Sequence, residues 1–134
     1  MILGIGIDLC MIPRIGDMIE KYGERFLNRV FTEDERIYCE RFSSVPRIGS
    51  YAKRWAAKEA CVKALGTGVA KGITLQDISV FNDAAGAPKI ALRGKALAAL
   101  EELTPTNSRA EILVSLTDDT PFAMAQVIIQ AIYV

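Results

Sequence analysis

The chain has 134 residues, which suits one domain with a modest hydrophobic core. Its formal net charge is +0 and its pI is about 6.3, so it has no overall positive field for nucleic acid. Hydrophobic residues make up 51% of the chain, a high share for a small soluble protein. We therefore expect part of the apolar surface to be buried between subunits.

The residue types that are missing restrict the chemistry. The sequence has no histidine, the commonest general base near neutral pH and the commonest transition-metal ligand. Its cysteines, Cys10, Cys39 and Cys61, are odd in number and lack metal-site spacing, which predicts neither a disulfide framework nor a zinc site. No apolar run is long enough to span a membrane, and residues 1–10 lack signal-peptide features. We expect a cytoplasmic protein with no membrane and no nucleic-acid partner.

The chain opens with a strand and a helix. Residues 2–9 form a continuous apolar run, which is typical of a buried strand. A helix follows, with Pro13 in its first turn. Residues 24–31 either continue this helix beyond Gly23 or form a second short helix.

Two further helices are expected before the middle of the chain. Thr32 and Glu35 have the spacing of a capping box and mark a helix start. Residues 43–50 have turn chemistry and are predicted to be a connector. Residues 54–65 are rich in good helix formers and end at a glycine-rich loop, residues 66–72.

The second half of the chain is rich in strands. The predicted elements are strands at 77–81 and 88–92, a helix at 94–103, and strands at 111–116 and 122–134. This order predicts an α+β fold, with a mainly antiparallel sheet packed with helices. We expect one domain over residues 1–134.

The first candidate site residue is Asp8, at the end of the apolar strand. Alternate residues of a strand share a face, so Gly4, Gly6 and Asp8 lie together. The two glycines leave room beside Asp8 for a group to approach the backbone. A carboxylate in such a place is costly unless it is paired or binds a cation. The alternative is that Asp8 caps the following turn.

The second candidate is Glu59, on the helix predicted at 54–65. It falls on the helical arc that carries Trp55 and Val62, which is expected to face the core. Lys63 follows at i+4, in the favourable order for an ion pair. The alternative is an ordinary surface pair worth a few tenths of a kcal/mol.

Two partly shielded carboxylates and a lysine, without histidine, favour a magnesium–phosphate site. Mg²⁺ prefers oxygen ligands, commonly one or two carboxylates with phosphates and water, and lysine binds phosphate. Arg54 and Lys58 lie at i and i+4 on a neighbouring face and could extend such a site, or simply form a solvated face. The loop at 66–72 is not a P-loop and is only a weak phosphate signal.

Several segments together resemble the holo-acyl-carrier-protein synthases, the small bacterial type of 4′-phosphopantetheinyl transferase. The similar segments are "GIGIDLCMIPRI", "FLNRVFTEDE", "RWAAKEACVKALGTG" and "ISVFNDAAGAPKIAL", in order from residue 3 to about residue 92. The most specific parts are the early G-x-D and the later W-A-A-K-E-A-x-x-K. The resemblance implies the 4′-phosphopantetheinyl transferase fold.

The resemblance also implies a reaction. An enzyme of this family transfers 4′-phosphopantetheine from coenzyme A to a serine of apo-acyl carrier protein, releases 3′,5′-ADP and serves fatty acid biosynthesis. Asp8 and Glu59 match its Mg²⁺ ligands, and Lys63 matches a lysine that contacts phosphate. Arg54 matches an arginine that holds the nucleotide's phosphates, and Lys58 is assigned to the same coenzyme A site. The base that activates the serine is Glu59 or a metal-bound water.

One segment departs from the family pattern. The family often carries H-x-S-[LI]-[ST]-H near its last strands, whereas "LVSLTDD" has Leu113 and Asp118 at the histidine positions. Coenzyme A contacts assigned to this segment are therefore in question. The family is also a homotrimer with active sites between adjacent subunits, which agrees with the high apolar content.

The first helix is expected to dock the carrier protein, as it does in the family. If residues 13–30 form one helix, Arg14, Lys21 and Arg25 share a stripe with Met18. A basic stripe with a methionine suits an acidic helical partner. The alternative is a solvated face of mixed charge.

Two other classes of protein stay open at this point. A non-catalytic trimeric domain that binds Mg²⁺ and a nucleotide would bind coenzyme A without transfer. A metal-dependent nucleotide phosphohydrolase would release product without any carrier protein.

Overall fold

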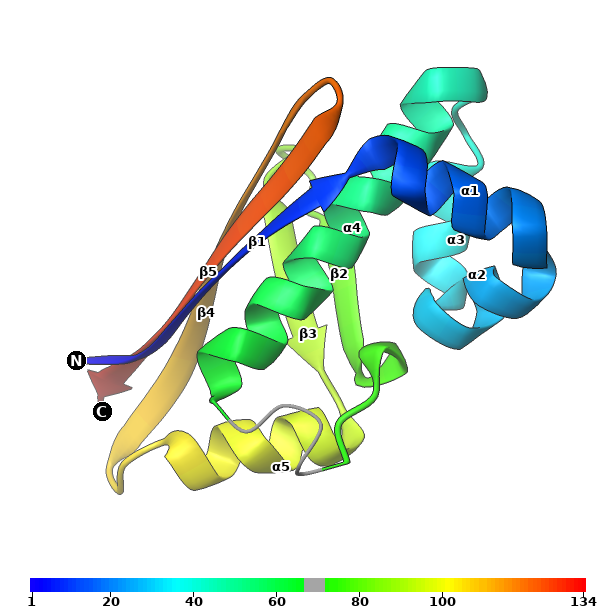
Figure 1. Cartoon of the computed structure of the whole chain (residues 1–134). Coiled ribbons are helices and arrows are strands. Elements are labelled where there is room, and N and C mark those ends of the chain that lie inside the picture. Colours follow the sequence, from blue (N-terminus) through cyan, green and yellow to red (C-terminus); the bar gives the residue numbers. More distant parts are fainter. Residues whose placement is uncertain (67–71) are drawn as a thin grey trace.

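The computed structural model describes residues 1–66 and 72–134 (Figure 1). Its helices are α1 (Ile12–Tyr22), α2 (Glu24–Val30), α3 (Glu33–Cys39), α4 (Ser44–Leu65), the 3₁₀ turn η2 (Leu75–Asp77) and α5 (Gly94–Leu103). Its strands are β1 (Ile2–Met11), β2 (Ile78–Asn82), β3 (Pro88–Leu92), β4 (Ser108–Asp119) and β5 (Phe122–Tyr133). All the strand pairings are antiparallel, so the predicted α+β class is confirmed.

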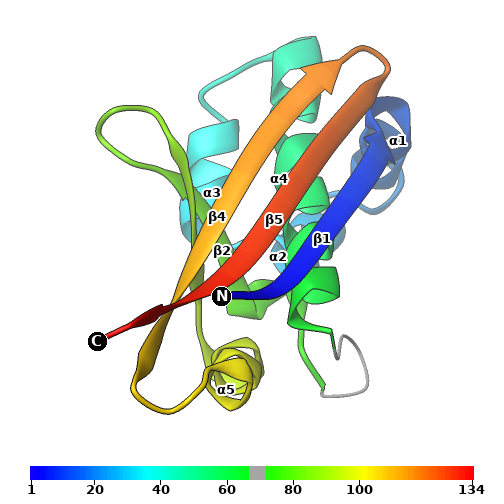
Figure 2. The same cartoon turned by 90° about the vertical axis from the view of Figure 1, so that its left-hand side faces the viewer.

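The strands form two sheets. β1, β5 and β4 make a three-stranded sheet in that order, while β2 and β3 form a separate hairpin. The first strand therefore pairs with the last, and the two chain ends lie side by side (Figure 2). The terminal amine of Met1 donates to the carbonyl of Ala131 at 3.1 Å.

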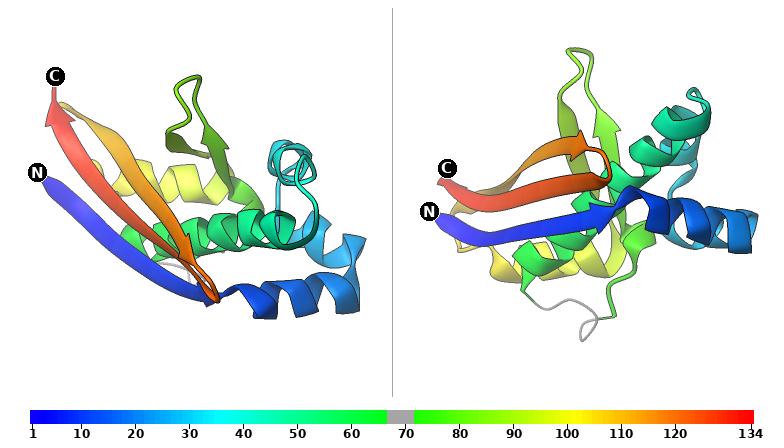
Figure 3. Two further views of the ribbon diagram at one scale, coloured as in Figure 1. Left: turned by 90° about the horizontal axis from the view of Figure 1, so that it is seen from above. Right: turned by 45° about the horizontal axis from the view of Figure 1, so that its top comes forward.

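The long helix α4 covers the inner face of the three-stranded sheet (Figure 3). Its core positions are mostly alanines, and Ala52, Ala56, Ala57 and Ala60 are completely buried. Small side chains let the helix approach the sheet closely. The opposite face of the sheet is open in this single chain, and Ile5, Ile7 and Leu9 of β1 are exposed there. The predicted buried strand is thus buried on one face only.

Three boundaries test the predictions for the helices. Gly23 has φ 56° and ends α1, so the segment 13–30 is two helices and not one. The capping box of Thr32 and Glu35 is confirmed. α4 begins at Ser44, earlier than predicted, because Pro46 falls in the first turn, where a missing N–H costs nothing.

All three cysteines are free and buried, as expected without a disulfide framework. Within the described ranges, no helix is both long and apolar enough to cross a bilayer.

Candidate active site

Two glycines of β1 set the distance between the strand and α4. A Cβ atom on Gly6 would lie 1.9 Å from the carbonyl oxygen of Ala60, and one on Gly4 would lie 1.9 Å from that of Ala64. The space predicted beside Asp8 for an approaching group is therefore filled by the backbone of α4 itself. Only glycine permits this contact. As a result, β1 lies directly beside the helix that carries Glu59 and Lys63.

Asp8 and Lys63 meet across this contact. Lys63 Nζ lies 3.3 Å from Asp8 Oδ1 and donates a 2.9 Å hydrogen bond to the carbonyl of Ile7. The Asp8 side chain is 17% exposed, whereas that of Lys63 is 56% exposed and open to solvent. The N-cap of α1 is Met11, without a side-chain hydrogen bond. Asp8 is thus an ion-pair partner and not the helix cap that was the alternative.

Glu59 lies close enough to Asp8 for their charges to interact. Burial raises the pKa of Asp8, while Lys63 and Arg14 act in the opposite direction. Burial also raises the pKa of Glu59, and the negative charge of Asp8 raises it further. A bound cation would favour the ionised form of both carboxylates.

The donor set fits a hard cation with few protein ligands. Within residues 1–66 and 72–134 no cluster of three or more His, Cys, Asp or Glu side chains could hold a metal. Asp8 and Glu59 supply carboxylate oxygens, which suit Mg²⁺ when phosphates and water fill its other positions. They do not suit zinc, which takes His and Cys in closed sites.

Lys58 does not belong to this site. Its side chain is completely buried, and Nζ lies 2.7 Å from Glu35 Oε1. Nζ also donates to the carbonyls of Leu75 and Ile78, at 2.9 and 2.6 Å. These three acceptors satisfy the three N–H donors of an ammonium group. The structure therefore contradicts the predicted phosphate contact of Lys58.

Arg54 lines a cavity of about 440 Å³ on another side of α4. Its guanidinium donates to Asn82 Oδ1 at 2.7 Å and to Ser50 Oγ at 3.2 Å, and it stacks over Tyr38, 4.1 Å from the ring centre. Five residues of helix separate Arg54 from Glu59, a rotation of about 140°. Arg54 and Glu59, which were both predicted to lie at the phosphate site, thus point to different sides of α4 within one chain.

Among the polar residues of this cavity, Lys53 and Asn82 were assigned no site role from the sequence. Lys53 directly precedes Arg54, which is the only signal it gives, and Asn82 directly follows the strand predicted at 77–81. Asp118 lines the same cavity and pairs with Lys53 at 3.2 Å, whereas Leu113 is exposed on the outer face of β4. The two positions of the missing histidines therefore lie on opposite faces of the sheet.

The predicted docking residues lie on two helices. Arg14, Met18 and Lys21 are spaced by four and three residues on α1, so they share one face. Arg25 lies on α2, beyond the break at Gly23, and so outside that helical stripe. Of the glycine-rich loop predicted at 66–72, residues 67–71 lie outside the described residues.

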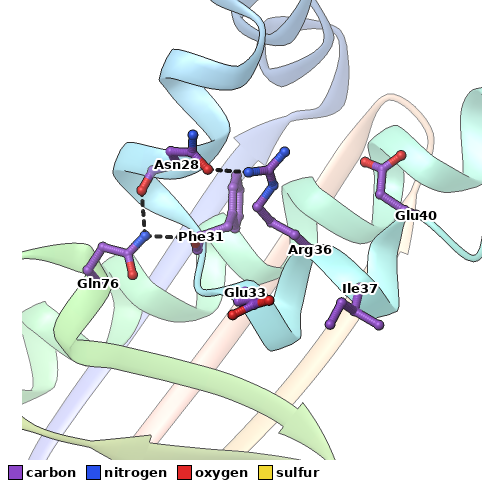
Figure 4. Close-up of a pocket in the computed structure, with 7 residues that line it drawn as sticks. All are labelled: Asn28, Phe31, Glu33, Arg36, Ile37, Glu40 and Gln76. Atoms are coloured by element: carbon purple, nitrogen blue, oxygen red, sulfur yellow. Dashed lines mark hydrogen bonds between the residues drawn. The ribbon is translucent and has the colours of Figure 1, made fainter.

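A separate cavity of about 560 Å³ lies between α2, α3 and η2 (Figure 4). The Gln76 amide donates to the carbonyls of Asn28 and Phe31, at 2.6 Å each, and Arg36 donates to Asn28. No predicted site residue lines this cavity. Because neither Asp8, Glu59 nor Lys63 lines it, this cavity is separate from the site that those residues form.

Comparison with known proteins defines the class of the chain. Residues 4–124 match the 4′-phosphopantetheinyl transferase superfamily, and the chain belongs to this superfamily. A holo-[acyl-carrier-protein] synthase from Gluconobacter oxydans (strain 621H) is 62% identical over 132 residues, which cover 98% of this chain and 84% of the relative. Within the superfamily, the chain therefore groups with the holo-[acyl-carrier-protein] synthases, as the sequence motifs predicted.

Solved structures agree with this grouping. The holo-[acyl-carrier-protein] synthase of Neisseria meningitidis matches with a TM-score of 0.83 at 30% identity, covering 97% of this chain and 99% of that chain. The enzyme of Bacillus anthracis str. Ames, solved in complex with CoA (3′,5′-ADP), matches with a TM-score of 0.76 at 34% identity, covering 96% of each chain.

Proposed function

We propose that this chain transfers the 4′-phosphopantetheine group of coenzyme A to a serine of apo-acyl carrier protein. The serine oxygen bonds to the β-phosphorus of coenzyme A, and the bond from that phosphorus to the oxygen of 3′,5′-ADP breaks. The observation that carries this proposal is the packing of β1 on α4, which brings Asp8 and Lys63 together beside Glu59 in a member of this family.

Asp8 and Glu59 are the residues that would hold Mg²⁺. When bound, the ion stabilises negative charge on the pyrophosphate of coenzyme A. Support comes from the two neighbouring carboxylates, whose pKa values burial raises. Lys63 would contact phosphate, because its exposed ammonium donates to Ile7 and Asp8 and has one N–H donor left to turn outward.

We propose that Glu59 takes the serine proton, because its carboxylate lies beside Asp8 and Lys63, where the pyrophosphate of coenzyme A would be held. Lys63 lowers the pKa of Glu59, and it would hold a phosphate oxygen near that base.

We also propose a homotrimer, with each active site between two subunits. Arg54 and Glu59 lie on different sides of α4, so a coenzyme A that contacts both residue types would bridge two copies of the chain. The exposed residues Ile5, Ile7 and Leu9 give the outer sheet face an apolar surface suited to subunit contact.

The carrier protein would dock on α1. Arg14, Met18 and Lys21 offer two charges and an apolar contact to an acidic helix. The positive charge of Arg14 acts on the pKa of Asp8, so this helix begins near the Asp8 carboxylate. We keep Arg25 as an outlying member of this surface, since it lies on α2.

Holo-acyl carrier protein carries acyl chains, so we place the reaction in fatty acid biosynthesis in the cytoplasm.

Intact-protein mass spectrometry of apo-acyl carrier protein tests the proposal. The carrier protein is incubated with coenzyme A, Mg²⁺ and the enzyme, beside a variant with Asp8→Ala and Glu59→Ala. A variant with Glu101→Ala, an exposed carboxylate of α5, serves as the matched control. A chelator is added in a further arm.

The expected result is a mass gain of one phosphopantetheine with the unmodified enzyme and the control, and no gain with the double variant or the chelator. Release of nucleotide without carrier protein would instead indicate a phosphohydrolase. Binding of coenzyme A without any mass gain would indicate a non-catalytic domain.

A further inference from the structure

Lys53 and Asp118 form an ion pair in the lining of the Arg54 cavity. Lys53 Nζ lies 3.2 Å from Asp118 Oδ1, and the two side chains are 31% and 42% exposed. Lys53 comes from α4 and Asp118 from the end of β4, so the pair crosses from the helix to the sheet. Both residues line the same cavity as Arg54.

An exposed ion pair by itself contributes little to stability. The position of the pair points to a role in ligand binding, because most hydrogen-bond donors of the Arg54 guanidinium already have partners in the protein. Its two terminal nitrogens donate to Ser50 and Asn82, and its Nε atom is buried without a partner among the described residues. Arg54 thus supplies a fixed positive charge deep in the cavity, with few donors left for a ligand.

The other walls of the cavity suit a nucleoside. Phe42 offers aromatic surface, and Pro46 and Pro88 offer flat apolar contact, whereas the ring of Tyr38 is already covered by Arg54. A base can stack on such residues while its phosphates need cations nearby. Lys53 is the exposed cation of this cavity, and its ammonium has three donors, of which Asp118 accepts one.

We propose that Lys53 is a second phosphate-binding residue of the cavity and that Asp118 positions it. The ligand is the phosphorylated nucleoside part of coenzyme A, so the inference rests on the proposed function. Asp118 holds the flexible lysine side chain in the cavity lining before the ligand arrives. This lowers the entropy that Lys53 loses on binding phosphate.

Calorimetry with 3′,5′-ADP tests the inference on the full chain. Lys53→Met is expected to raise the Kd about tenfold, the change for one good charge-assisted contact. Asp118→Ala is expected to raise the Kd about threefold, and to have no effect when Lys53→Met is already present. Lys89→Met, an exposed lysine of β3, is the control and should leave the Kd unchanged.

A merely structural pair would change the melting temperature and leave the Kd as it is, which would overturn the inference. Tighter binding by Asp118→Ala would also overturn it, because the carboxylate would then only neutralise Lys53. In turnover assays, Lys53→Met should raise the KM for coenzyme A and leave kcat within about twofold. Failure of the unmodified chain to bind 3′,5′-ADP would instead refute the nucleotide site of the proposed function.

Discussion

On one side of α4, Lys58 is enclosed by Glu35 and two backbone carbonyls, and its side chain is completely buried. On another side, Lys63 reaches Asp8 from solvent, and more than half of its side chain is exposed. Both lysines are charged and both have a carboxylate partner. They differ in whether their donors are already satisfied by the fold.

This difference distinguishes a lysine whose charge only stabilises the fold from a lysine whose charge can contact a ligand. The Glu35–Lys58 pair joins α3 to α4, and Glu35 also accepts hydrogen bonds from the backbone of Thr32 and Val80, at 2.7 Å each. Burial lowers the pKa of Lys58, but the nearby Glu35 acts against that change. Asp8, Glu59 and Lys63 are only partly buried, so their charges can act on a ligand.

The largest expected effect is on catalysis. Glu59→Gln keeps the shape of the side chain and removes its ability to hold Mg²⁺ and to accept a proton. We expect the transfer rate to fall by about 10²- to 10⁴-fold, the usual contribution of a positioned acid or base. The measurement is kcat/KM by mass spectrometry of the carrier protein. A loss of less than about tenfold would exclude Glu59 from both roles.

The next effect is on stability, on another side of the same helix. Lys58→Met leaves the Glu35 carboxylate buried without its cation, and we expect a loss of about 3–5 kcal/mol in the free energy of unfolding. Lys63→Met removes an exposed pair and should cost about 0–1 kcal/mol, while lowering activity. Denaturant unfolding of both variants measures the contrast. Equal losses of stability would show that the two lysines are not distinct.

The sequence could not distinguish these two lysines. Lys58 and Lys63 lie in one helix of good helix formers, and the buried partner of Lys58 comes from the capping box of another helix. The capping box itself was predictable, because Thr32 and Glu35 are local in sequence. The second role of Glu35, as a buried counter-ion, depends on how α3 packs against α4.

Local sequence patterns predicted the types of the secondary-structure elements well, but they did not predict which elements pack against each other. Alternation in β1 correctly placed Gly4, Gly6 and Asp8 on one face. The backbone of α4 fills the space beside the two glycines. This contact is non-local, so the residue pattern of β1 could not predict it. The break at Gly23 was an open alternative, because glycine is tolerated in a helix and also permits a positive φ.

A third variant tests the contact that assembles the site. Gly6→Ala places a methyl group against the carbonyl of Ala60, so β1 and α4 must separate. We expect a loss of about 1–3 kcal/mol in the free energy of unfolding, with lower activity. Gly16→Ala in α1 is the control, since its Cβ would meet only Ile48 at 3.5 Å. That variant should be neutral or stabilising by up to about 1 kcal/mol.

A smaller effect concerns the partner surface. Arg14→Glu should raise the KM for carrier protein about tenfold, because a like charge then faces an acidic partner. The Kd for coenzyme A should change little. Arg25→Glu should have a weaker effect, since Arg25 lies beyond the break at Gly23. An unchanged KM for Arg14→Glu would remove α1 from the docking surface, and equal effects would mean that the break does not matter.

The smallest effect is the dependence of stability on pH. Because burial and Asp8 raise the pKa of Glu59 above its ordinary value of 4.5, the folded chain holds that proton more tightly than the unfolded chain. Stability therefore falls as the pH rises through the folded pKa, and the full cost of ionising Glu59 in the folded chain is present at neutral pH.

With a chelator present, Glu59→Gln should melt slightly higher than the unmodified chain at neutral pH. The gap should close as the pH falls towards 4.5, where the unmodified carboxylate takes up its proton. A gap that is independent of pH would show that the ionised carboxylate is not the source of the cost.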